Sequence, residues 1–188
     1  MIFRIDDINK NTDFDKLLEY LFVIRDNTAA LIMLCISVLS TRDKTTERVF
    51  PKIYKAYSNH KVFFEVDQCF NPIEQDWWKR QFDQPDLLIA SHGLIHIDHR
   101  LLSREGQEMS IVVASSLTRS KIFVPPFHKW NNDTEAICSN HHIDLIKFED
   151  GWEHVLFNPY FHGNRNNYYF HPFDLTPEQL NQWFKGLK

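Results

Sequence analysis

Apolar and polar positions along the chain follow two different periods. The spacing of an amphipathic helix recurs at Phe14, Leu17, Leu18, Leu21 and Phe22. Further helices are predicted over residues 49–57, from 71, and over 109–117, 133–139 and 176–187. Short apolar runs predict buried strands at residues 2–5, 30–38, 61–66, 86–90, 121–124, 143–148 and 167–170. Strands that alternate with helices are typical of a parallel sheet covered by helices.

The order of these elements predicts an α/β fold in a single domain, residues 1–188. Seven strand candidates in 188 residues fit either an open doubly wound sheet or a small, incomplete β/α barrel, since a complete eightfold barrel typically needs about 250 residues. No linker rich in proline, serine or charge divides the chain. In both architectures, the side chains that follow the carboxyl ends of the strands meet at the functional site.

Composition narrows the classes of partner. The net charge of −4 provides no basic surface for nucleic acid. Three cysteines without C-x-x-C spacing exclude a disulfide scaffold and a thiolate zinc site. Acidic residues stand where a signal peptide needs its apolar stretch, and the longest apolar run, residues 29–39, is too short to cross a bilayer. We therefore expect no membrane span and a cytoplasmic location, while the oligomeric state stays open.

Four polar clusters each follow a predicted strand. They are Asp6-Asp7, His92-Gly93-Leu94-Ile95-His96, Val124-Pro125-Pro126-Phe127-His128 and Tyr169-Phe170-His171. Each cluster alone also fits an ordinary polar turn. Their shared placement after strand ends favours a common site.

The residue types in these clusters suit metal-assisted hydrolysis. Two histidines four residues apart can share a metal ion on a helical turn, and a nearby carboxylate completes an open site. Gly93 excludes a zincin, which needs glutamate there. Two adjacent aspartates at a strand end point differently, so that one can bind a cation while the other acts as a base. Tandem proline leaves the N–H groups of Phe127 and His128 for a ligand.

These clusters, in this order, resemble the motifs of the polysaccharide deacetylase (NodB-like) family, the carbohydrate esterases of family 4. The first motif resembles residues 3–7, the second residues 91–98, the third residues 124–128 and the last residues 169–171. The resemblance covers most of the chain and indicates a divergent, compact branch.

The resemblance implies a distorted, incomplete (β/α) barrel of about seven strands and assigns roles to five residues. Asp6 is then the catalytic base and His171 the general acid, and one divalent metal ion, zinc before others, is held by Asp7, His92 and His96. The expected substrate-binding residues are Pro126, Phe127, Trp130 and Trp152. The partner would be an N-acetylated carbohydrate.

Three departures from the family pattern bear on activity. Ile8 and His128 stand where the family has glycine, and Val124 stands where it has the arginine that pairs with the base. Arg4 and Arg165 are the candidate replacements, and Arg4 is favoured because it precedes Asp6 by two residues on the same strand face.

Two function hypotheses follow from these observations. The first is a metal-dependent hydrolase that deacetylates an N-acetylated sugar or polysaccharide precursor by amide C–N hydrolysis. The alternative is a catalytically impaired, deacetylase-like protein that binds carbohydrate. A phosphoesterase is disfavoured because the sequence offers no glycine-rich or arginine-clustered phosphate site.

Overall fold

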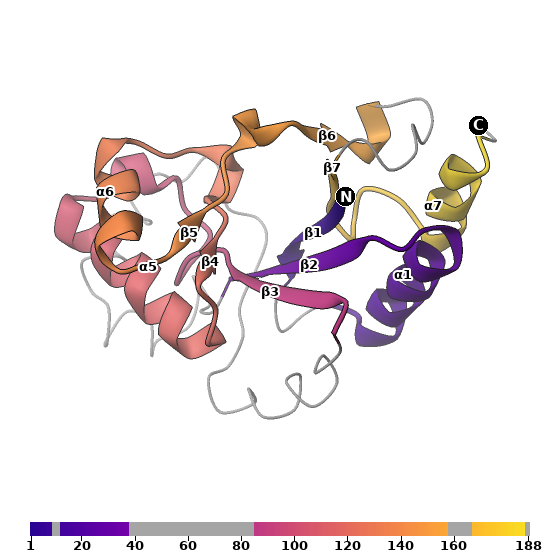
Figure 1. Ribbon diagram of the computed structural model, residues 1–188, viewed down its shortest axis with the longest axis horizontal. Coiled ribbons are helices and arrows are strands. Elements are labelled where there is room, and N and C mark those ends of the chain that lie inside the picture. The colour runs from indigo at the N-terminus through magenta and orange to yellow at the C-terminus, as the bar shows by residue number, and fades with distance from the viewer. Residues whose placement is uncertain (9–11, 38–84, 158–166, 187–188) are drawn as a thin grey trace.

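The computed structural model describes residues 1–8, 12–37, 85–157 and 167–186, and these form an open half-barrel of parallel strands (Figure 1). The strand order across the sheet is β5-β4-β3-β2-β1-β7-β6. The bounds are β1 Ile2–Ile8, β2 Leu31–Ile36, β3 Leu87–Ser91, β4 Ile122–Phe123, β5 Asp144–Leu145, β6 Trp152–His154 and β7 Asn167–Phe170. The sheet ends at β5 and β6, which do not pair with each other within the described residues. An incomplete barrel of seven strands is therefore confirmed.

Helices cover the outer face of this half-barrel. Helices α1 (Phe14–Asn27) and α7 (Pro177–Phe184) pack together beside β1, β2 and β7 (Figure 1). Helices α5 (Arg104–Thr118) and α6 (Asn132–Asn140) pack together near β3, β4 and β5. Short 3₁₀ turns occupy His99–Leu101, Pro126–His128, Phe148–Asp150 and Val155–Phe157. Among the described residues, none of the helices has the length and apolarity needed to cross a membrane.

The two faces of β1 show how the strand pattern separates the core from the site. Phe3 and Ile5 point outward into the core beneath α1 and α7, where full burial of such a side chain contributes about 1.5–3 kcal/mol to stability. Successive strand residues point to opposite faces. Arg4 and Asp6 therefore point into the half-barrel, and both are buried. A charged pair thus lies on the concave side, between apolar inner residues of the neighbouring strands.

Most predicted elements correspond to observed ones, with two differences. Strand β6 was not predicted, and the face predicted for α5 is only partly the buried one. Val112, Val113 and Leu117 are partly buried against the core, whereas Met109 and Ser116 are exposed. The apolar spacing predicts a face at Met109, Val112, Val113, Ser116 and Leu117, but the buried residues are Gly106, Gln107, Ser110, Ile111, Ala114, Ser115 and Thr118. Gln107, Ser110 and Thr118 are buried there with hydrogen-bond partners, as in the 2.7 Å contact between the Thr134 hydroxyl and Gln107 Oε1. The elements predicted at 49–57, 61–66 and 71 lie outside the described residues.

Candidate metal and catalytic site

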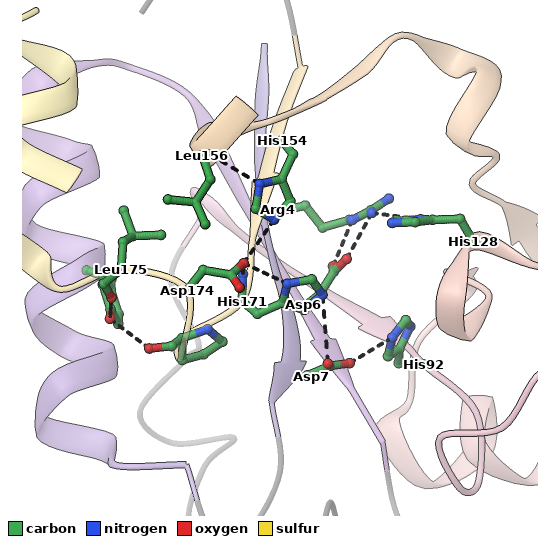
Figure 2. Close-up of polar contacts among 12 residues, drawn as sticks. Arg4, Asp6, Asp7, His92, His128, His154, Leu156, His171, Asp174 and Leu175 are labelled. Atoms are coloured by element: carbon green, nitrogen blue, oxygen red, sulfur yellow. Dashed lines mark hydrogen bonds and ion pairs between the residues drawn. The ribbon is translucent and has the colours of Figure 1, made fainter. Parts of the chain in front are cut away.

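A bulge at the end of β1 allows two consecutive aspartates to face the same site. Ile5 pairs with Leu34 and Ile8 pairs with Ile36, so β1 has one more residue than β2 between these pairs. Asp7 lies in the bulge with a left-handed backbone, φ 59°. Bulges of this kind redirect a side chain beside functional sites. Asp6 and Asp7 therefore both reach the concave side (Figure 2), while Ile8 returns to the outer core.

The carboxylate of Asp7 lies between the two histidines of the second cluster. Its Oδ1 is 3.2 Å from His92 Nε2 and 3.0 Å from His96 Nε2. The three ligand atoms lie close enough together to hold one metal ion. Burial alone would raise the pKa of Asp7, but His96 and His92 hold it well below its usual value. The structure brings together the three residues predicted as ligands.

The hydrogen bond made by His92 Nδ1, the ring nitrogen that faces away from Asp7, makes this residue suitable as a metal ligand. His92 Nδ1 is 2.7 Å from the carbonyl oxygen of Val124. A carbonyl only accepts, so Nδ1 carries a hydrogen, and in the neutral ring Nε2 is the nitrogen whose lone pair a metal ion would take. Metal-binding histidines characteristically donate their other ring N–H in this way. The donor set of two imidazoles and one carboxylate therefore fits a divalent ion.

The segment that carries His92 and His96 is an irregular loop, not the helical turn that the sequence suggested. Gly93 has φ +90°, and a Cβ there would lie 2.9 Å from His99 Cε1. His99 is itself fixed, because Nδ1 donates to the Ile97 carbonyl at 3.0 Å and Nε2 accepts from Ser110 Oγ at 2.9 Å. Burial lowers the pKa of His99 to about 4, so that it remains neutral. His99 supports the loop and is not a ligand.

We expect Gly93→Ala to destabilise the protein more than Gly151→Ala. Both glycines have positive φ, at +90° and +83°, so each alanine incurs a backbone cost of about 1–2 kcal/mol. Only the Gly93 methyl would also meet His99, since nothing lies within 4 Å of a Cβ at Gly151. Overpacking of this kind adds about 1–3 kcal/mol. Urea unfolding of both variants checks the difference, and equal losses would contradict it.

Asp6 forms a buried ion pair with Arg4. Arg4 Nε lies 2.7 Å from Asp6 Oδ1 and Nη2 lies 2.9 Å from Oδ2, a two-pronged contact (Figure 2). The guanidinium lies 4.5 Å from the Trp152 ring centroid and 4.8 Å from that of Tyr169. Burial opposes ionisation of Asp6, but Arg4 and the nearby histidines outweigh it and lower its pKa. The cation expected beside Asp6 is thus present at Arg4, whereas Arg165 lies outside the described residues.

The third cluster, residues 124–128, does not leave both of its predicted backbone N–H groups for a ligand. The N–H of His128 donates to the Pro125 carbonyl at 3.1 Å, so it is not left for a ligand. Phe127 and His128 have φ of 57° and 56°, in the left-handed region that favours glycine. The His128 side chain lies instead beside Arg4, with 3.2 Å between Nδ1 and Nη2. Arginine only donates, so Nδ1 accepts, and burial together with Arg4 lowers the pKa of His128 to about 4.

His171 is oriented by a carboxylate that the sequence analysis missed. Its Nδ1 lies 2.7 Å from Asp174 Oδ2, and its Nε2 faces Asp7 Oδ2 at 3.8 Å (Figure 2). Burial disfavours the charged imidazole, but Asp174, Asp7 and Asp6 outweigh it and raise the pKa of His171. The spacing His171-Pro172-Phe173-Asp174 was the available signal, because a carboxylate three residues away can close a short turn.

A second set of two histidines and one aspartate lies behind His171. Its members are His154, His171 and Asp174, and their ligand atoms also lie within reach of one ion. The Leu156 N–H, however, donates to His154 Nδ1 at 3.2 Å. His154 Nε2 therefore carries a hydrogen and directs it at Asp174 Oδ2, 2.9 Å away. Unlike His92, His154 offers a hydrogen where a metal would need a lone pair, so this set suits hydrogen bonding.

The residues expected to bind substrate have different surroundings. Phe127 packs edge-on against His96, with 4.3 Å between ring centroids, and is 36% exposed. Pro126 is buried, and Trp152 is buried against Arg4. The ring centroid of Trp130 lies 4.3 Å from Lys147 Nζ. Substrate contact by these residues stays a prediction. The exposed aromatic rings that contact histidines of the site are Phe127, Phe148, Phe157 and Phe173.

Comparison with known proteins places this geometry in a known fold. No family model and no curated protein matches the sequence. Among solved structures, a family 4 carbohydrate esterase from Streptomyces lividans in complex with acetate matches with a TM-score of 0.59 and 14% identity, over 98% of this chain and 88% of that one. A family 4 pseudoenzyme from Bacillus anthracis matches with a TM-score of 0.60 and 11% identity, over 98% and 59%.

A third structure agrees with these two. The peptidoglycan deacetylase PdaC from Bacillus subtilis matches with a TM-score of 0.53 and 11% identity, over 98% of this chain and 81% of that one. Because all three identities are low, the likeness concerns the fold. This chain has the fold of the family 4 carbohydrate esterases, the NodB-like polysaccharide deacetylases.

Proposed function

We propose that this protein is a divalent-metal-dependent hydrolase that removes the acetyl group from an N-acetylated carbohydrate. The observation that carries the proposal is the convergence of three groups on one site. These are a carboxylate paired with a cation (Asp6), two imidazoles that flank a carboxylate (around Asp7), and an imidazole held by a carboxylate (His171). Amide hydrolysis needs a base, an electrophile and an acid for the leaving amine.

The described residues divide this chemistry between them. Asp6, which Arg4 keeps ionised and oriented, accepts a proton from the attacking water. His171 donates a proton from Nε2 to the departing amine, since its Nδ1 is engaged by Asp174. Asp7, His92 and His96 would hold the divalent ion, with zinc favoured, and that ion supplies Lewis acidity toward water and the amide carbonyl. Phe127 offers an exposed ring beside His96 for the apolar face of a sugar.

The structural neighbours support the chemical class and leave one alternative to test. One neighbour is a carbohydrate esterase in complex with acetate, the product of the proposed reaction. Another is described as a pseudoenzyme. A protein of this fold can therefore lack activity, so the test has to separate hydrolysis from binding.

The test is acetate release from the N-acetylglucosamine trisaccharide by zinc-loaded protein. We expect one divalent ion per chain and equal amounts of released acetate and new free amine. Chelation should stop the release of both products, and returning zinc should restore it. A protein that binds one ion and the trisaccharide but releases no acetate would establish the carbohydrate-binding alternative. Absence of metal binding would refute both the ligand set and the proposed mechanism.

A further inference from the structure

One oxygen of Asp174 accepts hydrogen bonds from two imidazoles, one at the end of β6 and the other just after β7. Oδ2 receives the His171 backbone N–H at 2.8 Å and His171 Nδ1 at 2.7 Å. The same oxygen receives His154 Nε2 at 2.9 Å. The first two bonds close a local turn, which is also held by the Asp174 N–H donating to the His171 carbonyl at 2.9 Å. The bond from His154 is the long-range one, and the proposed hydrolysis does not require it.

The surroundings of His154 fix it as a hydrogen-bond donor. Parallel pairing of β6 with β7 sets His154 level with Tyr169, two residues before His171. Its ring packs edge-on against Tyr169, with 4.7 Å between centroids. The Leu156 N–H occupies Nδ1, so the hydrogen is on Nε2 and faces Asp174 (Figure 2). The pairing of β6 with β7 thus sets the position of His154, and the backbone of its own segment sets its tautomer.

We propose that His154 is a positioning residue for the acid His171 and that it acts through Asp174; this rests on the function proposed above. The local turn holds Asp174 from the His171 side only, so its carboxylate can still rotate. His154 holds the same oxygen from β6 and stops that rotation. The His171 ring is then held with Nδ1 on Asp174 and Nε2 toward Asp7. Partners that orient metal-ligating histidines typically change metal affinity or activity 10–100-fold when they are removed, and we expect an effect of about the same order for this acid.

The kinetic test compares two substitutions of His154. His154→Leu removes the donor and keeps much of the volume, and we expect kcat for trisaccharide deacetylation to fall about 10-fold with KM and bound zinc unchanged. His154→Gln keeps an N–H donor and should stay within about 3-fold of the wild type. His141→Leu is the matched control, because His141 pairs with Glu108 at 2.7 Å on the surface; its kcat should not change.

A double-mutant cycle separates action through Asp174 from a general packing effect. In an Asp174→Ala background, His154→Leu should lower kcat by less than about 2-fold, because the shared partner is already absent. If the two losses multiply instead, His154 does not act through Asp174 and the proposal is wrong. If His154→Leu folds poorly, by thermal unfolding, His154→Gln is measured alone, because it keeps the N–H donor. A full loss in that variant would equally overturn the proposal.

Ring nitrogen NMR gives a measurement that does not depend on activity. With ¹⁵N-labelled histidine, His154 should appear as the Nε2–H tautomer in the zinc-loaded protein. The His171 ring signals should shift in His154→Leu and remain near the wild-type values in His141→Leu. Unchanged His171 signals would overturn the proposal. A wild type that releases no acetate but shows the expected shifts would refute the proposed function and leave the His154–Asp174–His171 coupling established.

Discussion

Asp6→Asn should lower acetate release by about 10²–10⁴-fold, the usual contribution of a positioned general base, while the protein keeps one zinc ion per chain. Asparagine has nearly the same shape but no basic oxygen. Metal content should hold because Asp6 faces Arg4, whereas Asp7 faces His92 and His96. Steady-state rates on the trisaccharide and metal analysis of the same samples check both halves of the prediction.

Asp7→Asn is the matched comparison, since it makes the same chemical change one residue away. It should lose zinc first and activity as a consequence, because a neutral amide replaces the carboxylate between the two imidazoles. Asp6→Asn has its own structural cost, because it leaves the buried Arg4 without a counter-charge, about 3–5 kcal/mol. Rates are therefore compared per folded molecule, measured by circular dichroism. Equal zinc loss in both variants would show that the two roles cannot be separated.

The alternation of residues along β1 made part of the site predictable. Arg4 and Asp6 share a strand face by spacing alone, and the structure shows them in a two-pronged ion pair. Asp7 was predicted as a ligand from the family pattern, yet strict alternation would turn it away from Asp6. The bulge resolves this conflict. It depends on the pairing register with β2, which the sequence of β1 does not contain.

The residues behind His171 were missed for a related reason. Asp174 lies three residues away and closes a local turn, so its spacing carried a usable signal. His154 reaches Asp174 from β6, a strand of three residues, Trp152–His154, that is too short for a hydrophobic period to reveal. Its contact with Asp174 depends on which strands become neighbours in the sheet. A local sequence pattern can therefore predict the residues that follow a long strand. It does not predict contacts that arise only because two strands are neighbours in the sheet.

The buried face of α5 shows the limit of hydrophobicity as a guide. Ser110 is fully buried because its hydroxyl joins the Leu94 N–H at 3.0 Å to His99 at 2.9 Å. Met109, beside it, is 37% exposed. A helix that supports a polar loop buries the side chains that can hydrogen-bond to it. Apolar spacing identified the helix and two residues that pack against the loop of His92 and His96, Val113 and Leu117, but not Ser110, whose hydroxyl connects the helix to that loop.

Arg4→Met should depress catalysis and move the acidic limb of the pH–rate profile to higher pH. Methionine can still pack between Trp152 and Tyr169, where the guanidinium now lies. Burial raises the pKa of Asp6 and Arg4 opposes it, with a net lowering, so loss of the cation must raise the pKa. A base works only when ionised, and kcat/KM therefore begins to fall at a higher pH than in the wild type. Arg4→Lys keeps the charge without the fork and should lie between the two.

Arg25→Met controls for the loss of a paired arginine away from the site. Arg25 forms a similar two-pronged contact with Asp86, at 2.6 and 3.0 Å, and its removal should leave the pH profile unchanged.

Arg4→Met/Val124→Arg then tests whether the position of the guanidinium matters. Val124 is buried with the inner-face residues of the half-barrel, where the family pattern has its arginine. We expect the double variant to regain part of the lost kcat/KM and to move the acidic limb back toward the wild-type pH, because Asp6 requires a cation within the half-barrel. An unchanged profile in Arg4→Met would remove Arg4 from the mechanism.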